Sequence, residues 1–206
     1  MPRAAAPRHR NESHGRLPFR GPETVSFLGR YPFVLGEHEV ASIRVPWDDH
    51  RATRRDSLIP GTVIRPLKRL VDERGYLMEM MRLDWPDVFK NVPMSYVSMS
   101  YPGVIRAWHG HPRTKQRDTF VVPVGMIKAV VYDEATGELN EHILGEENPI
   151  LLSFDGSKWH GFKCLGTKPC LLMNFPDKMY DYANPDEARR PFNDPKIPYN
   201  WDIVMK

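Results

Sequence analysis

Residues 120–132 read Phe-Val-Val-Pro-Val-Gly-Met-Ile-Lys-Ala-Val-Val-Tyr, and they carry the clearest indication of the fold class. It holds two short runs of β-branched and aromatic residues, 120–124 and 126–132, with the turn-forming Gly125 between them. Runs of this length and composition are typical of strands, and a glycine between them indicates a tight turn. The stretch therefore predicts two neighbouring strands.

The same texture extends in both directions from this stretch. Similar runs recur at residues 92–99, 139–144, 149–154 and 170–175, with turn residues between them. Many short strands about ten residues apart predict an all-β sandwich or barrel, of which the double-stranded β-helix, or jelly roll, is a common form. Only residues 84–90 have a helical pattern. The tail beyond Tyr180 is irregular, and its aromatic end is predicted to wrap back onto the domain.

The N-terminal part has a different composition. Up to Arg55 it holds ten arginines, no lysine and six acids, a net charge of +4, whereas the remainder has 19 bases and 20 acids, a net charge of −1. We expect residues 1–24 to be a disordered basic tail, residues 25–60 an N-terminal arm, and residues 61–206 the jelly-roll domain. A near-neutral domain argues against a nucleic-acid-binding protein, which would carry a basic face.

The composition also indicates the cellular compartment of the protein. No stretch approaches the ~18 apolar residues that a membrane span needs, and no apolar run follows the N-terminus as in a secretory signal. We therefore expect a cytoplasmic protein that binds neither membrane nor nucleic acid. In a reducing compartment Cys164 and Cys170 are expected to be two small buried hydrophobic residues.

Three histidines lie beside predicted strands. His109 and His111 belong to Arg-Ala-Trp-His-Gly-His, and His160 belongs to Lys-Trp-His-Gly-Phe. Along a strand, His109 and His111 point to the same face, because side chains alternate with a period of two. Trp108 precedes His109 and Trp159 precedes His160. Each tryptophan is expected to point to the face of its strand opposite the histidine. Two interpretations follow, a metal site or acid–base chemistry without a metal.

Four segments, in order along the chain, resemble the motifs of the dTDP-4-dehydrorhamnose 3,5-epimerase family. Residues 72–79 resemble its D-x-R-G-x-x-x-E signature, 106–109 its R-G-x-H strand, 159–162 its A-H-G-F segment and 192–201 its W-N-D…I-x-W ending. The resemblance covers residues 60–202, about two thirds of the chain. It implies a cupin jelly roll, usually a homodimer with an exchanged N-terminal strand, that needs no metal or other cofactor.

The resemblance also implies a reaction on a nucleotide-linked 4-keto-6-deoxy sugar. It makes His109 the base and Asp194 the carboxylate that orients it. A ketone at C4 acidifies the protons on C3 and C5, so an imidazole can remove one and leave an enolate. Arginines match diphosphate oxygens in bidentate pairs. The implied substrate contacts are Arg74, Glu79, Arg106 and His160.

Two positions depart from the family. Asp118 stands at the substrate-binding position where the family has a lysine that helps to hold the enolate oxygen, and an ionised acid would repel that oxygen. Met173 stands where the family has the tyrosine that returns a proton on the opposite face of the sugar. Tyr180 and Tyr182, a few residues on, are candidate proton donors.

The leading prediction is an epimerase or keto-sugar isomerase of deoxysugar biosynthesis, acting on a sugar linked to a nucleotide, with dTDP as the expected one. Two alternatives stay open. One is a metal-dependent cupin enzyme that uses His109, His111 and His160, with Asp118 as a further candidate ligand. The other is a non-catalytic cupin that binds sugar nucleotides and has lost the chemistry.

Overall fold

The computed structural model describes residues 58–88 and 91–203, so the predicted tail and most of the arm lie outside the described residues. The described residues form strands, turns and loops, and no helix. None of them therefore forms a helix that could cross a membrane, and the cytoplasmic location stays a prediction. The strands are β1 (Val63–Pro66), β2 (Arg69–Asp72), β3 (Gly75–Met78), β4 (Tyr96–Ser100), β5 (Ile105–Gly110), β6 (Arg117–Val124), β7 (Met126–Asp133), β8 (Glu138–Gly145), β9 (Ile150–Asp155), β10 (Trp159–Leu165), β11 (Cys170–Asn174) and β12 (Ala188–Arg189).

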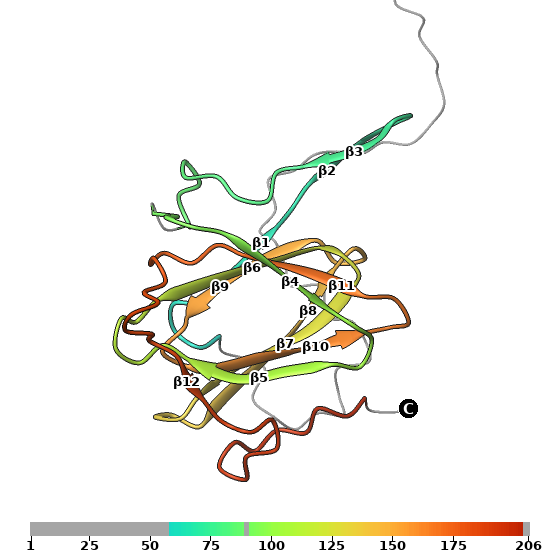
Figure 1. Ribbon diagram of the computed structural model, residues 1–206. Coiled ribbons are helices and arrows are strands. Elements are labelled where there is room, and N and C mark those ends of the chain that lie inside the picture. The colour runs from blue at the N-terminus through green and yellow to red at the C-terminus, as the bar shows by residue number, and fades with distance from the viewer. Residues whose placement is uncertain (1–57, 89–90, 204–206) are drawn as a thin grey trace, which may run out of the picture. The chain divides into compact units, whose positions relative to one another are not determined.

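Two five-stranded antiparallel sheets make up the domain (Figure 1). The first has the order β1-β9-β6-β11-β4, and the second has the order β12-β5-β10-β7-β8. Strands β2 and β3 pair only with each other, as a separate hairpin. Apart from β7 and β8, which are consecutive in the chain, neighbours within the two five-stranded sheets come from distant segments, as expected for a jelly roll. The predicted all-β jelly-roll fold is confirmed.

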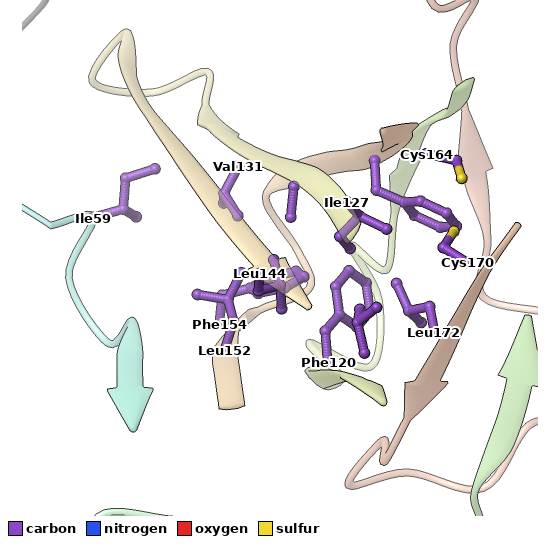
Figure 2. Close-up of a cluster of buried hydrophobic side chains, with 13 residues drawn as sticks. Ile59, Phe120, Ile127, Val131, Leu144, Leu152, Phe154, Cys164, Cys170 and Leu172 are labelled. Atoms are coloured by element: carbon purple, nitrogen blue, oxygen red, sulfur yellow. The ribbon is translucent and has the colours of Figure 1, made fainter. Parts of the chain in front are cut away.

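The decisive stretch forms β6 and β7, and both strands are buried on both faces. Phe120 and Val122 of β6 belong to the main core cluster, whereas Val121 between them packs in a second cluster. Because side chains alternate along a strand, a strand covered on both sides reads as an unbroken apolar run. The main cluster also holds the free thiols of Cys164 and Cys170 (Figure 2), as expected from the sequence.

One predicted element is wrong and another is confirmed. Residues 84–88 form turns rather than a helix, with Trp85 and Val88 anchored in the second core cluster. A segment this short with Pro86 inside it makes too few helical hydrogen bonds to persist, so the packing of its apolar side chains decides its shape. The aromatic end of the C-terminal tail does wrap back, since Trp201 packs on Trp108 of β5.

Candidate active site

The two sheets enclose a cavity of about 400 Å³. Strands β4, β6 and β11 of the first sheet line one side, and β5, β10 and β12 of the second sheet line the other. Its lining is rich in polar and titratable groups, unlike the core in Figure 2. The lining residues are Tyr96, Ser98, Ile105, Arg106, Ala107, His109, His111, Asp118, Phe120, His160, Gly161, Phe162, Leu172, Asn174, Glu187 and Arg189.

The pairing of β5 with β10 brings the three histidines together. His109 lies opposite His160 in the register of the two strands, with a bulge directly after His160. Gly161 makes this close approach possible, because a Cβ atom on it would lie 2.3 Å from the Cβ atom of Ala107. His109 and His111 both line the cavity, whereas Trp108 packs on the outer side of the sheet with the C-terminal tail. The alternation expected from the sequence is therefore observed.

Asp118 of β6 lies against two of these histidines. Its Oδ2 atom is 3.4 Å from Nε2 of His111 and 3.4 Å from Nε2 of His160, and the residue is 1% exposed. The three ligand atoms all lie within 4.8 Å of one another. Oδ1 accepts hydrogen bonds from Gln116 Nε2 at 2.9 Å and from Asn174 Nδ2 at 2.7 Å. Oδ2 has no hydrogen-bond partner among the described residues.

Backbone carbonyls set the tautomer of both histidines. Nδ1 of His111 is 2.6 Å from the carbonyl oxygen of Asp186, and Nδ1 of His160 is 2.9 Å from that of Lys158. A carbonyl oxygen only accepts, so each Nδ1 carries a hydrogen and donates it. When either ring is neutral, its Nε2 therefore has a bare lone pair, and both Nε2 atoms point toward the unpartnered oxygen of Asp118.

The electrostatics of this cluster follow from burial and charge together. Burial raises the pKa of Asp118, but His111, His160 and the amide of Asn174 outweigh this and lower it to about 2. Burial lowers the pKa of His111, and its contact with Asp118 more than compensates, so the net change is upward. For His160 burial dominates and lowers the pKa. The carboxylate is therefore ionised at neutral pH, and the buried His160 is neutral.

His109 stands apart from this cluster at the cavity wall. It is half-buried, and its ring centroid is 6.0 Å from that of His160. Burial, followed by the neighbouring His160 and Arg189, lowers the pKa of His109 to about 4, and Glu187 opposes this change. The imidazole is therefore neutral at pH 7 and can accept a proton from a molecule in the cavity.

Two arginines add positive charge to the lining. Arg106 of β5 donates from Nε to Ser100 Oγ at 2.8 Å and from Nη2 to the carbonyl oxygen of Met99 at 3.1 Å, which holds its guanidinium at the cavity. Arg189 of β12 lies opposite His109 in the register and pairs with Glu187 at 2.7 Å. Such groups suit the oxygens of a phosphate or a developing enolate.

The expected partnership of His109 with Asp194 is not formed in the described part of the chain. Asp194 does not line the cavity; its Oδ1 accepts from the backbone N–H of Lys196 at 2.9 Å, and its Oδ2 lies 3.7 Å from Arg190 Nε. This hydrogen bond from the backbone of Lys196 to the side chain of Asp194, two residues earlier, forms a local turn. Pro195, between the two residues, favours the same turn. The carboxylate that accompanies histidines here is Asp118.

Four other expected site residues also lie away from the cavity. Arg74 sits on the exposed β2–β3 hairpin and pairs with Asp72, and Glu79 pairs with Arg82 at 2.6 Å. Tyr180 and Tyr182 contact each other, with ring centroids 4.9 Å apart, and neither lines the cavity. Of the predicted site residues, the structure brings together at the cavity His109, His111, Asp118, His160 and Arg106.

The cavity contains residues that the sequence alone did not indicate. Tyr96 and Asn174 face it from β4 and β11, and Glu187 and Arg189 face it near β12. Tyr96 falls within the predicted strand at 92–99, but which of the two alternating faces meets the cavity is decided by the packing of the sheets. No local pattern could have identified it.

Comparisons with known proteins agree with this architecture. No protein-family model matches the chain. A probable low-salt glycan biosynthesis epimerase, Agl13 of Haloferax volcanii, is 44% identical over 147 residues, which are 69% of this chain and 94% of that protein.

Solved structures show the same likeness. A dTDP sugar isomerase from Desulfovibrio desulfuricans is 31% identical with a TM-score of 0.64, and the match covers 69% of this chain and 92% of that one. A dTDP-4-dehydrorhamnose 3,5-epimerase from Elizabethkingia anophelis shares the fold at 20% identity with a TM-score of 0.60, over 72% of this chain and 85% of that one.

Proposed function

Because the chain belongs to the dTDP-4-dehydrorhamnose 3,5-epimerase family, as a divergent member, we propose that it epimerises or isomerises a nucleotide-linked 4-keto-6-deoxy sugar. Two of the relatives named above are a protein named as a probable epimerase of glycan biosynthesis and an isomerase of dTDP sugars. The observation that carries the proposal for this chain is His109, which faces a cavity large enough for a hexose from the wall of one sheet. The nucleotide that we propose is dTDP.

His109 acts as the base in this proposal. A ketone at C4 makes the hydrogen on the neighbouring carbon acidic, and the neutral imidazole removes it while the electron pair moves onto the ketone oxygen. The lowered pKa of His109 keeps the ring unprotonated at neutral pH. Arg106 and Arg189 line the same cavity. Their positive charges would stabilise the enolate oxygen or bind the diphosphate.

The hairpin β2–β3 supports a homodimer as the working form. Its apolar side chains are exposed, with Val71 at 73%, Leu77 at 60% and Leu70 at 52%. An exposed apolar hairpin that carries Arg74 suits a surface on a second copy of the chain. In such a dimer Arg74 and Glu79 would meet the nucleotide in the partner's cavity, which they do not reach within their own chain.

The test is solvent exchange. Wild-type protein incubated in D₂O with a dTDP-4-keto-6-deoxyhexose should place deuterium on a carbon next to the ketone, as read by mass spectrometry and proton NMR. His109→Ala should lower the exchange rate by about 10²-fold or more. His142→Ala is the matched control, because His142 is a buried histidine that does not line the cavity. Binding of dTDP without any exchange by the wild type would identify a non-catalytic sugar-nucleotide binder.

A metal-dependent enzyme is the second candidate, and the geometry of His111, Asp118 and His160 favours it. Two Nε2 lone pairs and one bare carboxylate oxygen converge with no hydrogen between them when both rings are neutral. The ligand atoms of a tetrahedral ion with bonds of ~2.1 Å lie about 3.4 Å apart, which matches both separations of 3.4 Å. Histidine ligands also commonly donate their other N–H to a carbonyl oxygen, as both do here.

Metal analysis separates the two candidates. Protein purified without chelator and then dialysed against Zn²⁺ or Mn²⁺ should retain about one equivalent if this cluster is a metal site, and His111→Ala should lose it. Occupancy below a tenth of an equivalent removes the metal-dependent candidate. The His142→Ala variant controls for adventitious binding to histidine.

A further inference from the structure

Inversion of a carbon centre needs two groups on opposite sides of the substrate. A base removes the hydrogen from one face, and an acid must return a hydrogen to the other face, because return from the same side restores the original configuration. His109 supplies one side of the cavity from β5 of the second sheet. The wall that faces it is made by β4, β6 and β11 of the first sheet, so the acid is to be sought there.

Tyr96 is the one phenol that lines the cavity among the described residues. It lies on β4, an edge strand of the first sheet, and lines the cavity from that wall, where a ligand in the cavity can contact it. Met173, at the position where the resemblance expects a tyrosine, packs with the second core cluster instead of lining the cavity. Tyr180 and Tyr182 contact each other outside the lining.

Asn174 fixes the direction of the hydrogen bond to this tyrosine. The amide oxygen of Asn174 accepts from the backbone N–H of Thr119 at 3.0 Å, and its amide nitrogen donates to Asp118 Oδ1 at 2.7 Å. These two partners determine which end of the amide is which, because a backbone N–H only donates and an ionised carboxylate only accepts. The amide nitrogen is also the atom that lies 2.9 Å from the hydroxyl of Tyr96.

The hydroxyl of Tyr96 is therefore an acceptor in this contact. Its own hydrogen is not used in the bond with Asn174, and no hydrogen bond donated by the hydroxyl is found among the described residues. Asn174 is 1% exposed and anchored at three points, so it holds the phenol oxygen in place while leaving its hydrogen free to rotate toward the cavity. Burial also raises the pKa of Tyr96, which keeps the phenol protonated at neutral pH.

We propose that Tyr96 is the acid that protonates the sugar on the face opposite His109; this rests on the epimerase function proposed above. In the first step the C–H bond breaks, its hydrogen passes as a proton to the His109 ring, and its electron pair forms the enolate. In the second step the enolate carbon takes the hydrogen of the Tyr96 hydroxyl as a proton, the C=O bond reforms, and a phenolate remains. Water then carries a proton from the imidazolium to the phenolate, which restores both groups.

The experiment compares exchange with inversion in Tyr96→Phe. The substrate is a dTDP-4-keto-6-deoxyhexose in D₂O; mass spectrometry follows deuterium incorporation, and proton NMR follows the configuration of the product. We expect the variant to incorporate deuterium within a few-fold of the wild-type rate, because His109 still removes the hydrogen and returns a deuteron on the same face. Formation of the epimer should fall by about 10²-fold or more. Tyr101→Phe is the matched control, since Tyr101 is exposed and does not line the cavity.

Each result decides a different point. Epimer formation by Tyr96→Phe at the wild-type rate would overturn the role of Tyr96 while leaving the epimerase function intact. An equal loss of exchange and inversion, with unchanged dTDP binding by calorimetry, would also overturn it, because the phenol would then serve the first step as well. Absence of exchange in the wild type would reject the epimerase function, and the proposal for Tyr96 with it.

Discussion

The same two sheets enclose two interiors of opposite character. The core cluster in Figure 2 is apolar throughout, and Ile127, Leu144 and Leu152 within it are fully buried. The cavity places Asp118 and His160 at similar depth, with exposures of 1% and 4%. Depth of burial therefore does not distinguish the two regions; the polarity of the buried groups does.

The two regions also differ in what they contribute. Burial of apolar side chains stabilises the fold by about 25 cal/mol for each Å² removed from water. A buried carboxylate costs free energy unless partners compensate it, and one oxygen of Asp118 has no hydrogen-bond partner among the described residues. Clusters of buried titratable groups with shifted pKa values are typical of sites that bind or react. The apolar region thus stabilises the domain, and the polar region is the candidate for function.

The largest expected effect comes from the apolar region. Leu152→Ala removes a side chain with 0% exposure from the middle of the core, and it should lower the free energy of unfolding by about 4 kcal/mol through lost burial and the cavity left behind. Chemical denaturation measures this loss. Leu70→Ala on the exposed hairpin is the control, and its free energy of unfolding should change little. Equal losses of stability in the two variants would contradict the assignment of stability to the apolar core.

His142, a buried histidine outside the cavity, extends the comparison to the dependence of stability on pH; the charge of the neighbouring Glu141 only partly opposes the effect of burial on its pKa. His142 is 8% exposed, its Nε2 has no hydrogen-bond partner among the described residues, and burial lowers its pKa to about 4. Since its unfolded pKa is about 6.5, only the unfolded state gains a proton as the pH falls from 7 toward 4. His142 should therefore cost about 3 kcal/mol of stability over that window and nothing further below it.

His142→Leu tests this by removing the titrating group at similar volume. The difference in unfolding free energy between variant and wild type should grow in favour of the variant as the pH falls from 7 to 4. Denaturation curves at four or five pH values measure it. A difference that stays constant with pH would show that His142 protonates as readily in the folded chain as in the unfolded one.

A smaller effect is expected from a change in the polar region. Asp118→Asn keeps the shape and the acceptor oxygen for Asn174, and its new amide nitrogen can donate to the bare Nε2 of His160 or His111. The free energy of unfolding should change by no more than about 1 kcal/mol, far less than for Leu152→Ala. A loss as large as that of the core variant would mean that the carboxylate is a structural group.

The smallest effect on stability is expected at the hairpin. The Arg74 side chain is 83% exposed and, among the described residues, pairs only with Asp72, so Arg74→Ala should leave the unfolding midpoint unchanged. If the hairpin serves the cavity of a second copy, the same variant should weaken dTDP binding by roughly 10-fold, with Arg74→Lys in between because it keeps the charge but loses the planar fork. Calorimetry with unaltered affinity in both variants would remove Arg74 from the nucleotide site.

Much of the fold was predictable because its signals are local. The six runs recognised in the sequence fall in β4, β6, β7, β8, β9 and β11, and the alternation of side chains placed His109 and His111 on one face. The prediction of a helix in the segment at 84–90 failed because the conformation around Trp85 and Val88 depends on packing against core residues that are distant in the sequence. The proposed N-terminal divisions at 1–24 and 25–60 stay predictions.

Local patterns were enough to predict the strands and the set of histidines, since both depend on neighbours along the chain, and the number and spacing of the strands favoured a jelly roll. The acid and the phenol that lie near these histidines depend on how the two sheets pack against each other. The side chain of Asp194 is hydrogen-bonded within a local turn of the C-terminal tail. Asp118 on β6 contacts His160 on β10 because the two sheets face each other. Tyr96 meets the cavity for the same reason. Contacts across two packed sheets join residues far apart in sequence, and no local pattern records them.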